Sequence, residues 1–238
     1  MRPNGEVVTQ HVAATGSGKD VDSVTAHIAE LLRPHLAGVT GIGLAAAGVL
    51  DHAAGVIRES PNFPEWRDVA LGRLLADALG LPAHLENDVN AMVLGEHRAG
   101  AGRGYQHVVG LALGTGVGGG IILNGGLWRG SRGMAAELGH VTVERQGRLC
   151  GCGNRGCLEQ YAGAVGIQKS LAELGYADLV GQPDASRIAA ERARNGDMAL
   201  KQMFDEIGMY LGVALGTYLH TLDVQRFIIA VSYTHLRA

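Results

Sequence analysis

Apolar residues in the first hundred positions follow two patterns, one typical of amphipathic helices and one of buried strands. Val24–Leu36 and the segment 68–80 place apolar residues every three or four positions, which predicts two helices, the second capped by Gly80. Gly41–Leu50 is a nearly continuous apolar run, which predicts a buried strand that ends in a glycine turn. The other expected elements are short strands at 7–12 and 82–88 and a helix at 89–100. Strands that alternate with helices are typical of an α/β layer.

The second half of the chain resumes this alternation after a glycine-rich break at 100–104. His107–Leu113 and Gly120–Leu123 are apolar and are joined by a glycine loop, as in a β-hairpin. We expect a domain boundary near the break, which divides the chain into an α/β domain of residues 1–106 and a larger one of residues 107–238. The remaining expected elements are helices at 164–174, 185–193 and 198–222 and a buried strand at 226–230.

The composition is that of a globular protein and excludes several classes of partner. Hydrophobic residues make up 47% of the chain and charged residues 18%. The net charge of −3 provides no basic field for nucleic acid, and no apolar run reaches the length of a membrane span. The N-terminus lacks the apolar core of a signal peptide, and three cysteines are an odd number for a disulfide framework. We therefore expect a cytoplasmic protein without nucleic-acid or membrane partners.

All three cysteines lie within eight residues, at Cys150, Cys152 and Cys157. Thiolates are the soft ligands that zinc prefers, and a structural zinc site takes four Cys or His ligands. His140, ten residues before the first cysteine, is the candidate fourth ligand. The alternatives are three buried free cysteines or a redox cluster, but these thiols alternate with glycine in a polar loop. Four protein ligands leave no open position, so zinc would shape the loop rather than react with a substrate.

Three carboxylates and a glycine loop each allow a chemical and a purely structural interpretation. Asp88 follows a predicted strand and is either a general base at the end of the sheet or the cap of the next helix. Glu137 and Glu159 bracket the cysteine loop and either accept hydrogen bonds from a polyol or are solvated surface charges. The glycine loop at 114–120 exposes backbone N–H groups, which suits phosphate, but it matches neither nucleotide fingerprint and is by itself better interpreted as a plain turn.

Four segments carry a family resemblance by their order and spacing: LENDVNAMVLGE, LALGTGVGGGIILNGGLWRG, AAELGHV and CGCGNRGCLEQYA. Over residues 7–230 the chain resembles the ROK family of bacterial sugar kinases and sugar-responsive repressors, and within it the ATP-dependent glucokinases. The resemblance implies an actin–hexokinase (ribonuclease H-like) type of α/β fold, with two α/β domains and a cleft. It also implies phosphorylation of a hexose, glucose to glucose 6-phosphate, in glycolysis, by a protein that is a homodimer at full length. The sugar-sensing domain of a repressor is the alternative.

The same resemblance implies roles for particular residues, with structural Zn²⁺ in the protein and ATP with Mg²⁺ as co-substrate. Asp88 matches the catalytic base that deprotonates the sugar hydroxyl, and Asn87 matches a neighbouring sugar contact. Glu137 matches a sugar-binding residue, and His140 matches one that both ligates zinc and touches the sugar. The other implied roles are sugar contacts for Asn62 and Glu159, zinc ligation by Cys150, Cys152 and Cys157, and nucleotide phosphate binding by Gly114, Thr115 and Gly116.

The chain departs from the family pattern near both ends. It opens on MRPNGEVV, which looks like the second strand of such kinases, without the D-x-G-G-T loop for phosphate and Mg²⁺. The sequence VSYTHLRA stands where the family has a glycine-rich adenosine-binding segment. We therefore expect an incomplete gene fragment with little or no kinase activity, and an exposed strand edge that favours aggregation.

Overall fold

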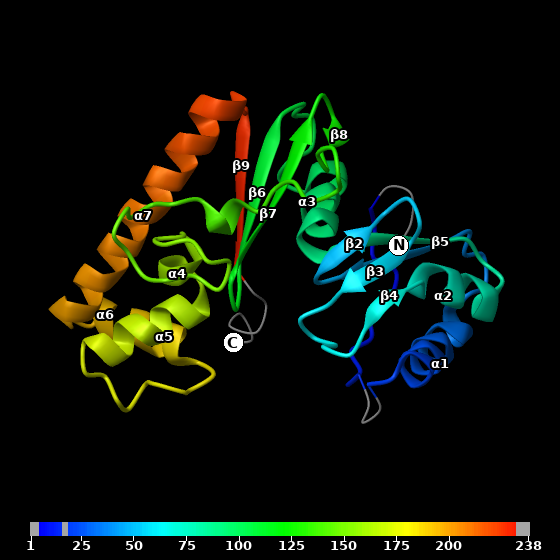
Figure 1. Ribbon diagram of the computed structural model, residues 1–238, viewed down its shortest axis with the longest axis horizontal. Coiled ribbons are helices and arrows are strands. Elements are labelled where there is room, and N and C mark those ends of the chain that lie inside the picture. The colour runs from blue at the N-terminus through cyan, green and yellow to red at the C-terminus, as the bar shows by residue number, and fades with distance from the viewer. Residues whose placement is uncertain (1–4, 16–18, 232–238) are drawn as a thin grey trace. The chain divides into compact units, whose positions relative to one another are not determined.

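The computed structural model describes residues 5–15 and 19–231, and the chain forms two compact units (Figure 1). The first unit contains residues 1–100 together with 129–135, and the second contains 101–128 together with 136–238. The short segment 129–135 thus returns to the first unit from within the second. The sequence predicts two domains, residues 1–106 and 107–238, each a single continuous stretch of chain. Their limits stay a prediction. The sequence that departs from the family pattern after residue 231 lies outside the described residues.

The first unit is built from small sheets and the helices that pack on them. β1 and β5 pair in parallel, with Ile42 opposite Ala83 at one end and Ala46 opposite Asn87 at the other. A separate antiparallel sheet has the order β2-β3-β4. The strands are β1 (Ile42–Ala46), β2 (Val49–Asp51), β3 (Val56–Glu59), β4 (Arg67–Val69) and β5 (Ala83–Asn87). The helices are α1 (Val21–Leu32), the 3₁₀ turn η1 (Arg33–His35), α2 (Leu71–Leu79) and α3 (Asp88–Ala99).

Local sequence signals explain where these helices begin and end. Asp20 caps α1 by accepting a hydrogen bond from the Ser23 N–H at 2.9 Å. Gly80 ends α2 in the left-handed conformation, at a φ of 69°, as predicted. The core of the unit combines residues of both helices with β-sheet residues: Val24, Leu50, Ile57, Trp66, Leu75 and Leu85 are buried.

The predicted strand at 7–12 is wrong. Residues 6–15 form no regular element, and the side chains of Val7, Val8 and Val12 are 61 to 79% exposed. A strand is stable only when its backbone pairs with a neighbour and its apolar face is buried. The valines meet neither condition here, so their β-propensity alone does not produce a strand.

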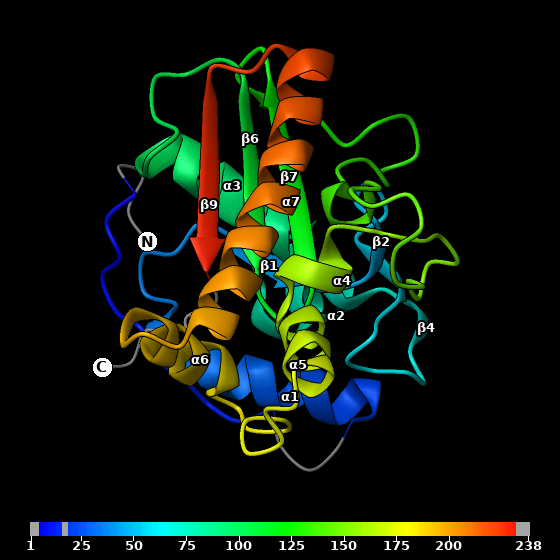
Figure 2. The same ribbon diagram turned by 90° about the vertical axis from the view of Figure 1, so that its left-hand side faces the viewer.

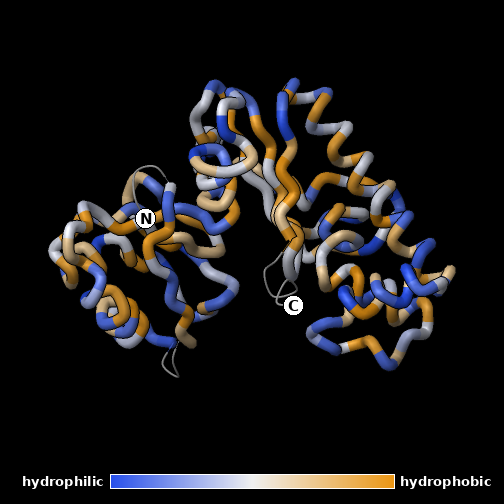
Figure 3. The backbone as a smooth tube through the Cα atoms, turned by 180° about the vertical axis from the view of Figure 1, so that it is seen from behind, coloured by the Kyte–Doolittle hydropathy of each residue, from blue (hydrophilic) through white to orange (hydrophobic). Residues whose placement is uncertain are grey.

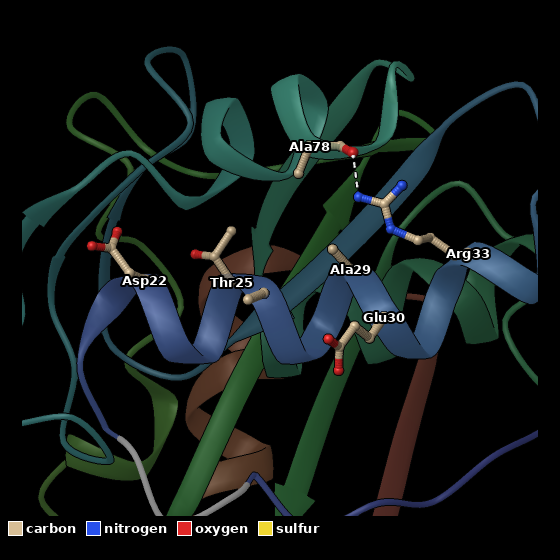
Figure 4. A pocket seen from close by; sticks show the side chains of 7 residues that line it. Asp22, Thr25, Ala29, Glu30, Arg33 and Ala78 are labelled. Carbon is tan, nitrogen blue, oxygen red and sulfur yellow. Dashed lines mark hydrogen bonds between the residues drawn. The ribbon is translucent and has the colours of Figure 1, made fainter.

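An open groove lies between α1 and α2 in the first unit (Figure 4). Arg33 spans its end, where its guanidinium donates a hydrogen bond to the Ala78 carbonyl at 3.2 Å and ties the end of α1 to α2. Asp22, Thr25 and Glu30 line the rest of the groove. None of the predicted site residues belongs to this lining, so the groove is not part of the candidate site.

The second unit has a sheet with strand order β8-β7-β6-β9, in which β6 and β7 are antiparallel and β6 and β9 are parallel. Figure 2 shows α7 running along one face of this sheet, and hydrophobic positions follow the strands and recur along the helix (Figure 3). Val109, Leu111 and Ile121 of the sheet are buried in one core with Ala214 and Tyr218 of α7. The strands are β6 (Val108–Leu113), β7 (Val117–Leu123), β8 (Gly126–Leu127) and β9 (Arg226–Val231). The helices are η2 (Leu138–His140), α4 (Glu159–Ala162), α5 (Ala164–Glu173), α6 (Ala185–Arg194) and α7 (Met198–Leu222).

The predicted hairpin at the glycine loop is confirmed, but its second strand starts earlier than expected. β7 begins at Val117, so the three glycines at 118–120 lie within the strand and pair with β6. A Cβ atom on Gly119 would lie 2.5 Å from the Ala136 carbonyl oxygen and from Leu138. The Ala136 carbonyl and the Leu138 side chain therefore cover the strand closely enough to exclude a side chain at position 119, and only residues 114–116 form the turn.

Among the described residues, none of the helices combines the length and the apolar character that a membrane crossing requires.

Candidate metal centre and active site

The loop between η2 and α4 brings His140 together with Cys150, Cys152 and Cys157. The ligand atoms of these four residues all lie within 4.8 Å of one another, and the cysteines are free. His140 Nδ1 is 3.5 Å from Cys150 Sγ, and Cys152 Sγ is 3.7 Å from Cys157 Sγ. Sulfur atoms around a tetrahedral zinc lie about 3.8 Å apart, because each Zn–S bond is about 2.3 Å long. The donor set and its spacing thus fit a structural Cys₃His zinc site.

The backbone of this loop folds into two tight turns that aim the thiols inward. The Cys150 N–H donates to the Asn154 carbonyl at 2.8 Å, and the Gly153 N–H donates back to the Cys150 carbonyl at 3.0 Å. Cys157 pairs with Thr142 in an isolated antiparallel bridge, which fixes the far side of the loop. These bonds hold a segment that contributes few apolar side chains to the core, so a bound metal would supply much of its stability.

Cys152 and Cys157 lie in different electrostatic environments. Burial raises the pKa of the Cys157 thiol to about 12, and hydrogen bonds with the neighbouring cysteines act in the same direction. The exposed Cys152 has a pKa below its usual range, chiefly because the backbone N–H of Asn154 donates a hydrogen bond to its sulfur. Cys152 is therefore the thiol that becomes anionic more readily, whereas a cation must displace the proton of Cys157.

Gly156 provides a test of how tightly this loop is packed. Its φ is 70°, and a Cβ atom there would lie 1.6 Å from the Glu144 carbonyl oxygen. We expect Gly156→Ala to lower the free energy of unfolding by more than about 1 kcal/mol, because alanine is strained in the left-handed conformation and its methyl group would clash with the backbone. Thermal unfolding of the zinc-loaded chain measures this. Gly151→Ala is the matched control, since nothing lies within 4 Å of its added methyl group; equal effects of the two substitutions would contradict the packing described.

The predicted sugar and phosphate residues of the second unit surround this loop. His140 Nε2, on the opposite side of the ring from the thiols, lies 3.8 Å from Glu137 Oε2. Glu159 begins α4, and its carboxylate accepts a hydrogen bond from the Val117 N–H at 3.2 Å. A Cβ atom on Gly116 would lie 2.2 Å from the same carboxylate oxygen. The metal loop, Glu159 and the 114–116 turn thus form one packed assembly, which the separate motifs did not indicate.

Asp88 lies at the carboxyl end of β5, as the first residue of α3. The helix is capped by Asn87, whose Oδ1 accepts hydrogen bonds from the N–H groups of Val89 at 3.0 Å and Asn90 at 3.1 Å. The alternative that Asp88 is itself the cap is therefore wrong. Its carboxylate is exposed and also accepts a hydrogen bond from the Val89 N–H at 3.0 Å.

Glu86, just before these residues, is an organising group that sequence reasoning missed. Its Oε1 atom accepts hydrogen bonds from the Asn87 N–H at 3.0 Å and from Asn90 Nδ2 at 3.2 Å. The same oxygen lies 3.2 Å from His52 Nδ1, and Oε2 accepts two hydrogen bonds from the Arg129 guanidinium. The only sign of this role in the sequence is that a charged residue, Glu86, stands within a short predicted strand. The ion pair with Arg129 also explains why the 129–135 segment belongs to the first unit.

The predicted residues therefore gather in two sets, one in each unit. Asn87 and Asp88 are adjacent at the end of β5 in the first unit. Asn62 is exposed in the turn between β3 and β4 of that unit, where its N–H donates to Ser60 Oγ at 3.3 Å. The set in the second unit consists of Gly114, Thr115, Gly116, Glu137, His140, Cys150, Cys152, Cys157 and Glu159.

Comparisons with known proteins place this geometry in a family. The model of the ROK family matches residues 3–237. The glucokinase of Thermotoga maritima is 42% identical over 198 residues, which are 79% of this chain and 62% of that enzyme. The chain thus spans less than two thirds of this relative. The xylose repressor of Bacillus subtilis is 32% identical over 196 residues, which are 81% of this chain and 48% of the repressor.

A solved structure supports the same assignment. The ROK family glucokinase of Streptomyces griseus, in complex with glucose and AMPPNP, is 31% identical and superimposes with a TM-score of 0.77, over 99% of this chain and 80% of that one. The predicted actin–hexokinase type of α/β fold is thereby confirmed. By its family match, its relatives and its fold, the chain belongs to the ROK family.

Proposed function

We propose that the protein is an ATP-dependent hexose kinase that converts glucose to glucose 6-phosphate, with Asp88 as the general base. The observation that carries this proposal is the exposed Asp88 carboxylate at the end of β5, next to an asparagine that already caps the helix. A carboxylate free of the capping role is available to accept the proton of an attacking sugar hydroxyl. The names of the glucokinase relatives support glucose as the acceptor.

Each set of residues has a defined task in this proposal. Asn87 and Asn62 orient the sugar in the first unit. In the second unit Glu137 and Glu159 accept hydrogen bonds from its hydroxyls, and His140 donates one to them. Backbone N–H groups of Gly114, Thr115 and Gly116 hold nucleotide phosphate, and Mg²⁺ bound with ATP would offset the phosphate charge. His140, Cys150, Cys152 and Cys157 would hold zinc, which supplies structural rigidity when bound.

Hexose binding by the full chain tests this proposal. We expect calorimetric titration to show that glucose binds, and that Asp88→Ala raises its dissociation constant about tenfold or more, since a charged hydrogen bond contributes about 1.5–3 kcal/mol. Asp77→Ala is the control, because Asp77 is an exposed carboxylate on α2 that pairs with Arg73. Unchanged affinity in the Asp88 variant, or no glucose binding by the wild type, would refute the assignment.

A second candidate function is the sugar-sensing domain of a repressor, which the similarity to xylose repressors favours. Titration with xylose, mannose, fructose and N-acetylglucosamine beside glucose distinguishes the two, because a preference for xylose over glucose indicates the sensor. The expectation of little kinase activity for this chain stays a prediction. Rapid ATP-dependent formation of glucose 6-phosphate by residues 1–238 would contradict it. The cytoplasmic location is likewise a proposal, made from the cysteine count and the N-terminal sequence, and the homodimeric state of the full-length protein is a proposal made from the resemblance.

A further inference from the structure

Gln160 and Lys169 connect the metal loop to α5 through one side chain amide. Gln160 is the second residue of α4 and is only 6% exposed. Its Nε2 atom lies 3.5 Å from Cys150 Sγ, and its Oε1 atom accepts a hydrogen bond from Lys169 Nζ at 2.6 Å. A buried amide with one end on a thiol and the other on an ammonium group is a chain of oriented dipoles, not a packing contact alone.

The chemistry of the two partners determines which way this amide points. A lysine ammonium group has three N–H donors and no acceptor, so it can bond only to the amide oxygen. The NH₂ group of Gln160 must then face the sulfur of Cys150. A thiolate is an acceptor, so this orientation suits an anionic sulfur and would be less useful to a neutral thiol. Lys169 therefore selects the orientation of Gln160 that favours the thiolate of Cys150.

The charge of the cluster explains why such support is useful. Zn²⁺ with three thiolates and one neutral imidazole carries a net charge of −1, and Cys150 and Cys157 are both buried. Buried negative charge is costly unless donors or cations compensate it. His140 Nδ1, the other group 3.5 Å from Cys150 Sγ, would be a ligand of the same metal rather than a compensating charge.

We propose that Lys169 is a positioning residue: it holds the Gln160 amide with its N–H group on Cys150 Sγ, and so raises the affinity of the loop for zinc. The proposal rests on the zinc site inferred for this family member, but not on the kinase activity. Partners around a metal ligand commonly change metal affinity by about 10 to 100-fold when they are removed. Lys169 extends this support from α4 to α5, so that the fold of the helices and the metal site stabilise each other.

The test is the zinc affinity of the full chain, measured by competition with a chelator of known affinity. We expect Gln160→Leu and Lys169→Met each to raise the zinc dissociation constant about tenfold. Because Lys169 acts through Gln160, the double variant should be hardly weaker than Gln160→Leu. Lys169→Arg, which keeps a donor for the amide oxygen, should restore most of the affinity. Lys201→Met is the control, since Lys201 is an exposed lysine on α7 that pairs with Asp205 at 2.7 Å.

Co²⁺ bound in place of zinc gives a second readout that a loss of packing would not reproduce. Gln160→Leu removes the N–H donor to Cys150, and Lys169→Met removes the group that orients this donor. Both changes alter the electron density on the sulfur, so the sulfur-to-cobalt charge-transfer band should shift in each single variant and keep its wild-type position in Lys169→Arg. Additive effects of the two substitutions, or unchanged zinc affinity and an unshifted band in Lys169→Met, would overturn the proposal. A wild-type chain that binds no zinc would overturn it as well, whereas a failure to bind glucose would affect the proposed function alone.

Discussion

Cys157→Ala is expected to abolish zinc binding and to release the loop between η2 and α4. Cys157 is fully buried and follows the loop at the point where the chain enters α4. Structural zinc contributes roughly 10 kcal/mol or more of apparent binding free energy in small zinc domains, so the loss of one of four ligands removes most of the stability of such a loop. Metal analysis should give about one zinc per wild-type chain and none in the variant.

Hydrogen exchange of the loop peptides measures the structural consequence. We expect fast exchange over residues 141–163 in Cys157→Ala and in the chelator-treated wild type, with exchange in the first unit unchanged. Thr142→Ala is a matched control, because it removes the 2.8 Å hydrogen bond from Asn154 Nδ2 but no metal ligand. The Thr142→Ala variant should still bind zinc, and hydrogen exchange over residues 141–163 should stay slow. A zinc-free wild type with the same protection as the loaded protein would show that the metal does not hold this loop.

Loss of zinc should also weaken hexose binding, since Glu159 lies only two residues beyond Cys157. Its hydrogen bond to the Val117 N–H links the metal loop to the 114–116 turn. Release of the loop would free the Glu159 carboxylate from this position and would disturb the predicted sugar contacts and the predicted phosphate contacts of the second unit. The metal would thus support the sugar site by holding Glu159 in place, without contacting the reacting atoms itself.

Elements and site residues that depend on local sequence could be predicted. The sequence predicts a long helix at 198–222, and α7 spans Met198–Leu222, because its apolar spacing and its capping residue Asp197 are local features. The four metal ligands are also recognisable, since thiols clustered in a glycine-rich polar loop are typical of a structural metal site. In both cases the information lies within about 25 residues of sequence.

Features that depend on distant packing could not be predicted. The glycines at 118–120 resemble a loop by composition, but they pair with β6 as a strand, and Ala136 and Leu138 pack against Gly119 where a side chain would not fit. The valines at 7–12 resemble a strand, but no neighbour pairs with them in the described part of the chain. The network of Glu86 joins residues 52, 86 and 129, and no local pattern indicates contacts across such separations.

Glu86→Ala is expected to destabilise the first unit by about 3 kcal/mol. The glutamate side chain is only 14% exposed, and its removal leaves N–H groups of Asn87, Asn90 and Arg129 without their shared acceptor. Breaking a buried ion pair from one side typically costs about 3–5 kcal/mol, and the lower end applies because the Arg129 side chain is 41% exposed. Arg129→Met should therefore cost less, about 1 kcal/mol, since Glu86 keeps its other donors.

Trp66 reports the stability of the first unit, because it is 2% exposed within that core. The chain has only two tryptophans, and the other, Trp128, is 44% exposed, so Trp128→Phe gives a background in which urea unfolding follows Trp66 alone. In this background the double variant of Glu86 and Arg129 should be less destabilised than the sum of the single variants, because the two residues share one interaction. Additive losses would show that Arg129 does not use Glu86 to join the first unit.

Because Asn87 and Asp88 follow Glu86 directly, Glu86→Ala should also weaken glucose binding. Such a loss would show that the Glu86 carboxylate helps to position both predicted sugar residues.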